Sequence, residues 1–164
     1  MIYTATLSEI QEIQAISARV WPPTYKDVIS AGQIEYMLDL MYSTEALKKQ
    51  MLEQGCEFIL YKPNIHSVGF ASYGKNEKGI WRLHKLYVDV DQHGKGIGKI
   101  LLEEVKKRVA QKGGTEVELN VNKRNKAKDF YFSQGFKIRR EEVLDIGEGY
   151  VMDDFVLVVE IPDF

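Results

Sequence analysis

Cysteine is nearly absent from this sequence, in which Cys56 is the only one. A single cysteine excludes intramolecular disulfides, so the fold must be stabilised by a buried core. Cys56 stands beside the apolar residues 58–61, and no neighbour in sequence is a cation that would lower the pKa of its thiol. We therefore expect Cys56 to have a structural role and not a catalytic one.

Long apolar runs and an excess of positive charge are also missing. No apolar stretch approaches the roughly 20 residues that span a bilayer, and residues 1–6 lack the features of a signal peptide. Lysine and arginine number 22 against 24 acidic residues, a formal charge of −2, so the chain has no general attraction for nucleic acid or anionic membranes. We expect a cytoplasmic protein without nucleic-acid or membrane partners, in which any anion site is local.

Hydrophobic periodicity predicts helices in the first third of the chain. A capping-box pattern at Ser8 precedes apolar residues at helical spacing, and the helix is predicted to end at Pro22-Pro23 because consecutive prolines lack amide donors. Two shorter helices are predicted, one over residues 34–41 and one from Ser43 onward. The sequence has no repeat or linker, so we expect residues 1–164 to form one domain.

The rest of the chain shows strand patterns separated by two amphipathic helices. β-Branched and aromatic residues and strict alternation predict the strands, and apolar residues at a spacing of three to four predict the helices. The strands are predicted over residues 2–6, 57–61, 67–73, 80–90, 117–121, 136–143 and 151–160, and the helices over 96–111 and 125–134. This pattern predicts a mixed α/β fold of about seven strands and four to five helices.

Three glycines, Gly94, Gly96 and Gly98, follow a predicted strand and open the next helix. Free amides at a helix N-terminus, with no Cβ atoms in the way, form a positive array of donors that suits a phosphate or pyrophosphate. The G-x-G-x-G spacing lacks one residue of the G-x-G-x-x-G dinucleotide fingerprint, and no P-loop motif is present. A tight turn without a ligand is the alternative interpretation.

The segment His-Gly-Lys-Gly-Ile-Gly at residues 93–98 resembles the [Q/R]-x-x-G-x-[G/A] loop of the GNAT superfamily of N-acetyltransferases. Both final glycines match, whereas His93 stands where the family has Gln or Arg. A second family motif is similar to residues 125–136, which begin with Asn125 and contain an aromatic-Tyr pair at Tyr131 and a Gly-Phe pair. The two motifs occur in the order that the family has.

The resemblance implies a fold, a cofactor and its contacts. It implies a mostly antiparallel sheet whose fourth and fifth strands splay apart around acetyl-CoA, and it implies no metal. The residues that it places at acetyl-CoA are Leu86, Tyr87, Val88, His93, Gly94, Lys95, Gly96, Ile97, Gly98, Lys99, Asn125 and Tyr131.

Acetyl transfer by direct attack needs an acid for the departing thiolate and a base for the amine proton. The resemblance places Tyr131 near the sulfur, so Tyr131 is the predicted general acid, with a core aromatic as the alternative. Family members use a fourth-strand glutamate, among other groups, as the base, and this strand has His84 and Lys85 instead. His84 is the predicted base because its reference pKa suits proton transfer, although a histidine on a strand is often structural.

Aromatic and acidic residues outside these motifs are the candidates for the acceptor site, namely Trp21, Tyr25, Tyr150 and Asp153, with Asp154 next to Asp153 near the final predicted hairpin. Carboxylates attract a polycation, and aromatic faces hold ammonium groups. The chain also resembles, more loosely, bacterial polyamine acetyltransferases of the spermidine/spermine type. A small-molecule primary amine or polyamine is therefore the expected acceptor, and a solvated turn is the alternative interpretation of Asp153-Asp154.

Two other functions stay open at this point. A peptide or protein acetyltransferase acting on N-termini or lysines would use the same cofactor site. A non-catalytic acyl-CoA-binding regulatory protein would keep that site without the chemistry. The sequence also leaves the oligomeric state open, a homodimer included.

Overall fold

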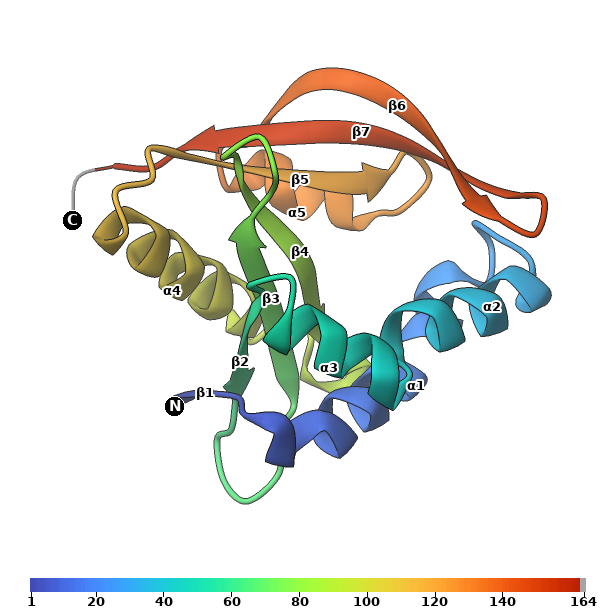
Figure 1. The fold of residues 1–164 in the computed structure, drawn as a ribbon, viewed down its shortest axis with the longest axis horizontal. Coiled ribbons are helices and arrows are strands. Elements are labelled where there is room, and N and C mark those ends of the chain that lie inside the picture. Colours follow the sequence, from blue (N-terminus) through green and yellow to red (C-terminus); the bar gives the residue numbers. More distant parts are fainter. Residues whose placement is uncertain (163–164) are drawn as a thin grey trace.

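A seven-stranded sheet runs through the whole of the computed structural model, which describes residues 1–162 (Figure 1). The strand order is β1-β2-β3-β4-β5-β7-β6, and every neighbouring pair is antiparallel except β4 and β5. The strands are β1 Ile2–Thr4, β2 Glu57–Tyr61, β3 Gly69–Lys75, β4 Trp81–Val88, β5 Glu116–Asn122, β6 Lys137–Gly147 and β7 Tyr150–Glu160. The predicted fold class and strand number are thus confirmed.

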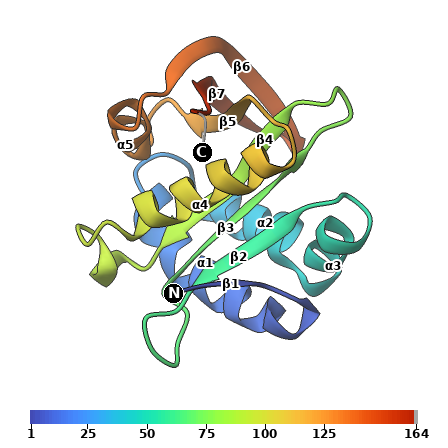
Figure 2. The ribbon, with the colours of Figure 1, turned by 90° about the vertical axis from the view of Figure 1, so that its left-hand side faces the viewer.

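Five α-helices cover the two faces of this sheet. They are α1 Ile10–Tyr25, α2 Ala31–Tyr42, α3 Thr44–Leu52, α4 Ile97–Gln111 and α5 Ala127–Ser133. Helix α4 crosses one face of β2–β4, and α1–α3 lie on the other (Figure 2). The sheet therefore separates two cores, one built around α4 and one built around α1 and α2. Within residues 1–162 no helix is long and apolar enough to cross a bilayer.

The predicted end of the first helix at Pro22-Pro23 is wrong, because α1 continues through both prolines to Tyr25. The carbonyls that lose a helical donor belong to Ala18 and Arg19, which are exposed, so water can bind them. The predicted capping box also lies two residues earlier, with Thr6 as the N-cap residue and Glu9 as its partner.

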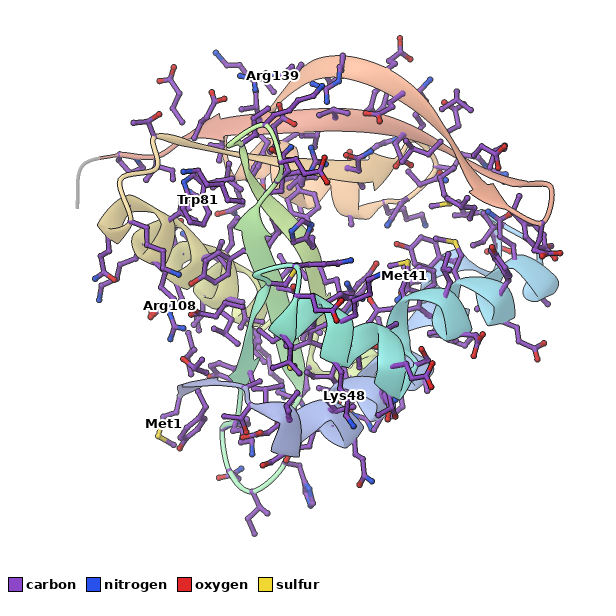
Figure 3. All side chains as sticks on the ribbon, viewed as in Figure 1. Met1, Met41, Lys48, Trp81, Arg108 and Arg139 are labelled. Atoms are coloured by element: carbon purple, nitrogen blue, oxygen red, sulfur yellow. The ribbon has the colours of Figure 1, made fainter. Side chains whose placement is uncertain are left out.

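Strands β4 and β5 pair at a single position, where Arg82 lies opposite Glu118, and beyond this pair they separate. Glu118 is 1% exposed and is held by Arg82 at 2.6 Å, by Arg139 from β6 at 2.6 Å and by Arg140 at 3.5 Å. Figure 3 labels Arg139 on β6. Burial opposes ionisation of Glu118, but the hydrogen bond from Arg139 and the neighbouring positive charges outweigh it and lower its pKa. This ion cluster therefore fixes the point at which the sheet opens.

Replacing Glu118 with Ala should destabilise the protein by about 3–5 kcal/mol, because it leaves the half-buried Arg82 without its carboxylate. Glu116→Ala is the matched control: Glu116 also binds Arg139, at 2.9 Å, but is more exposed, so its loss should cost no more than about 1 kcal/mol. Urea unfolding of both variants measures the difference. Equal destabilisation would show that the ion cluster does not hold the two strands together.

Candidate active site

The loop between β4 and α4 presents a row of free backbone donors. Within residues 1–162 the amides of residues 94–99 have no hydrogen-bond acceptor, and the first amide of the helix to find one is that of Ile100, which donates to Gly96 O at 3.0 Å. Gly94 and Gly96 adopt φ of 81° and 77°, and the space above both is open. Six adjacent donors at the start of a helix fit the pyrophosphate of acetyl-CoA.

Side chains around the loop hold it in place. The imidazole Nε2 of His93 lies 2.9 Å from Val88 O, so His93 ties the loop to the end of β4. Lys95 Nζ donates to Gln92 Oε1 at 3.1 Å and stays exposed beside the donors. Gly98 faces the ring of Phe130 on α5, which connects the two family-like motifs in space. His93 thus has a structural contact in the position where the family has Gln or Arg.

The end of β4 has main-chain hydrogen-bonding groups that are not used by a neighbouring strand. Leu86, Tyr87 and Val88 pair with Ala71, Phe70 and Gly69 of β3, but no residue of β5 pairs with them. Main-chain donors and acceptors on that side of β4 are therefore available to a ligand between the splayed strands, as a pantetheine arm with its amide groups requires.

A cluster of tyrosines meets at the open end of the splay. The hydroxyl of Tyr25 on α1 lies 3.0 Å from that of Tyr87 on β4, and Asn125 Nδ2 donates to Tyr25 at 3.4 Å. Trp21 packs on this pair, with ring centroids 4.4 Å from Tyr25 and 5.8 Å from Tyr87. Four residues predicted for two different sites, the cofactor site and the acceptor site, are therefore in contact.

Tyr131 on α5 belongs to the core around α4 and lies near the same cluster. Its side chain is 8% exposed and packs against Phe130 and Phe136, and no hydrogen bond to its hydroxyl occurs within residues 1–162. Burial raises the pKa of Tyr131, and the nearby Tyr25 adds to the effect. Tyr131 is thus fully protonated at neutral pH and can donate a proton.

The predicted base lies in a β-bulge. Ser72 and Tyr73 of β3 pair with Lys85 and Leu83, which leaves His84 as the extra residue of β4. His84 keeps exposed surface, but desolvation of its ring and the charges of Lys85 and Arg82 lower its pKa, so the ring is neutral at pH 7. Lys85 points into the α1–α3 core, where Gln50 Oε1 accepts from it at 2.7 Å and burial lowers its pKa to about 8.

Two predicted acceptor residues lie outside the tyrosine cluster. Tyr150 stacks on Tyr36 of α2, with ring centroids 5.3 Å apart. Asp153 points to the exposed side of β7 and pairs with Lys123 at 2.9 Å. The neighbouring Asp154, which the sequence groups with Asp153 near the final hairpin, is buried. Alternation along β7 predicts that only one of the two acids faces inward, because consecutive residues of a strand face opposite sides.

Comparison with known proteins agrees with this geometry. Residues 25–149 match the family model of the acetyltransferase (GNAT) domain. The chain is 31% identical over 144 residues to the peptidyl-lysine N-acetyltransferase YjaB of Escherichia coli (87% of this chain and 86% of that one). It is 25% identical over 153 residues to the spermidine N(1)-acetyltransferase of Thermoplasma acidophilum (90% and 92%). The crystal structure of the PaiA N-acetyltransferase of T. acidophilum in complex with coenzyme A has the same fold, with a TM-score of 0.82, 24% identity and 98% coverage of both chains.

Fold, loop and family model together define an acetyltransferase. The chain belongs to the GNAT family, and it is an acetyl-CoA-dependent N-acetyltransferase.

Substituting Gly96 by Ala should weaken the binding of coenzyme A about tenfold, because a left-handed backbone costs a residue with a Cβ about 1–2 kcal/mol and the loop will shift to relieve it. Gly98→Ala is the control, since Gly98 does not have positive φ and its added Cβ would lie 3.5 Å from Phe130, an ordinary contact. Calorimetric titration of coenzyme A measures both. Equal affinities of the two variants would contradict the assignment of the loop.

Proposed function

We propose that this enzyme acetylates a primary amine of a small polycation such as a polyamine. The observation that carries the proposal is an open pocket of about 670 Å³ between α1 and α2. Glu35 and Asp39 line it, both exposed, and no Lys or Arg does. Two carboxylates without a competing cation favour a ligand with several positive charges.

Aromatic side chains support the same class of acceptor. Tyr36 and Tyr42 line the pocket, and Tyr42 accepts a hydrogen bond from Trp21 Nε1 at 3.3 Å. Trp21 in turn packs against Tyr25 and Tyr87 at the open end of the splay. Aromatic rings attract ammonium groups and pack against methylene chains, which are the two components of a polyamine. The relative from T. acidophilum that is named a spermidine N(1)-acetyltransferase agrees with this acceptor class.

The chemistry that we propose is direct transfer. The amine nitrogen attacks the thioester carbon of acetyl-CoA, the C–S bond breaks, and the products are the N-acetylamine and coenzyme A. Tyr131 gives its proton to the departing sulfur. His84, neutral at pH 7, is the proposed acceptor of the proton that the amine loses.

Acetylation of a peptidyl lysine is the second candidate. The relative named for this activity, YjaB, is 31% identical to this chain. A lysine side chain presents the same kind of primary amine on an aliphatic arm, so the tyrosine cluster would accept it equally well. A lysine in a peptide has one side-chain ammonium, whereas the pocket has two carboxylates, and this difference makes a polyamine our first choice.

Tyr131→Phe tests the acid. Removing a general acid should lower kcat about 100-fold or more, whereas the affinity for coenzyme A should change less than about threefold. Tyr61→Phe, a change of the same kind on β2, serves as the control and should leave both unchanged. The release of free thiol measures kcat, and calorimetry measures the affinity. Unchanged turnover would remove the assignment.

A panel of amines tests the acceptor. We expect spermidine to give a higher kcat/KM than an aminoglycoside, a peptide with a free N-terminus or a lysine-containing peptide. Removing both pocket charges, in Glu35→Gln/Asp39→Asn, should raise the KM for spermidine about tenfold, by weakening the attraction for its charges. Glu77→Gln, an exposed acid in the loop after β3, is the control. No activity on any polyamine would dismiss the proposal, and a preference for the lysine peptide would favour the second candidate.

A further inference from the structure

Two adjacent acids of β7 have opposite environments. The side chain of Asp153 is 55% exposed and lies 2.9 Å from the Lys123 ammonium. Asp154 is 4% exposed and has no ion pair within residues 1–162. Because successive residues of a strand alternate between faces, Asp154 points into the protein on the side of β5 that carries Asn120 and Asn122.

The carboxylate of Asp154 is only half satisfied. Its Oδ2 accepts a hydrogen bond from Asn120 Nδ2 at 3.1 Å, whereas its Oδ1 is buried with no donor within residues 1–162. The nearby guanidinium of Arg82 binds Glu118 and Asn120 instead. Burial raises the pKa of Asp154, and the charges of Glu142 and Asp153 raise it further. A buried acceptor without a donor is destabilising, so the fold loses stability at this position, and a bound ligand could restore it.

Asp154 lies beside the place where the chemistry is expected. It pairs across the sheet with Asn122, the last residue of β5, at the end where β5 is separated from β4. Its charge is close enough to Tyr25 to raise the pKa of that hydroxyl, after the larger effect of burial. Tyr25 in turn contacts Tyr87 and Asn125. Asp154 therefore lies near the tyrosine cluster.

We propose that Asp154 is the carboxylate that binds the ammonium group of the acceptor, with Oδ1 as the hydrogen-bond acceptor. The assignment rests on the proposed function, since an amine substrate supplies both the positive charge and the donor that this oxygen lacks. Oδ1 is buried, so neighbouring side chains must move before the amine reaches it.

The test compares Asp154→Asn with Asp153→Asn. Asp154→Asn keeps a side-chain oxygen that can accept the hydrogen bond from Asn120 but removes the negative charge. At saturating acetyl-CoA, Asp154→Asn should raise the KM of the amine at least about tenfold, with an unchanged affinity for coenzyme A. Its Tm should stay equal or rise, because a buried charge is removed. Asp153→Asn should leave KM unchanged. An effect of Asp154→Asn on Tm or coenzyme A affinity without an effect on the KM of the amine would indicate a structural role and overturn the proposal.

A second measurement separates this inference from the proposed function. Spermidine is titrated calorimetrically into each protein loaded with coenzyme A, so that no turnover is needed. Loss of binding in Asp154→Asn alone supports the acceptor site even if the wild type acetylates no amine in the panel. Equal binding to wild type and Asp154→Asn overturns the role of Asp154 while the acetyltransferase activity stands. No binding to the wild type overturns the inference.

Discussion

The pairing of Arg82 with Glu118 is the only one between β4 and β5, and the rest of the site depends on it. Ordinary pairing along both strands would occupy the main-chain groups at the end of β4. Because the strands separate after one residue pair, the main-chain groups at the end of β4 that point toward β5 have no partner on that strand. A buried glutamate between arginines of β4 and β6 holds the rung in place, so the opening begins at a fixed position in the sheet.

The same opening brings the two cores together. Tyr131 belongs to the core around α4, whereas Tyr25 and Tyr87 belong to the core around α1 and α2. A continuous sheet would separate them. Where β4 and β5 diverge, the hydroxyls of Tyr25 and Tyr87 meet at 3.0 Å, and Tyr131 and Asp154 are near enough to Tyr25 to interact with it electrostatically. Groups able to hold an amine and to protonate a sulfur are thus positioned by rigid elements from both faces, which favours catalysis by orientation.

Much of the fold could be predicted from the sequence, because alternation and helical spacing report directly which faces are buried. The glycine loop and the Asn125–Tyr131 motif are local signals, so the sequence alone is enough to propose them. Features set by tertiary contacts cannot be predicted in this way. Helix α1 passes through Pro22-Pro23 because its packing against the core outweighs two missing donors. The bulge at His84 arises from pairing with β3. Which of Asp153 and Asp154 is buried depends on which face of β7 points inward, and this follows from the pairing of β7 with β5.

Amide hydrogen exchange with and without coenzyme A tests the central claim most directly, because it reads out the backbone donors themselves. Binding should slow exchange at residues 94–99, since these amides have no other acceptor within residues 1–162, and at amides of the end of β4 that point toward β5. Protection should be absent from the outer strand β6. Protection confined to other segments, with residues 94–99 still exchanging freely, would contradict the account.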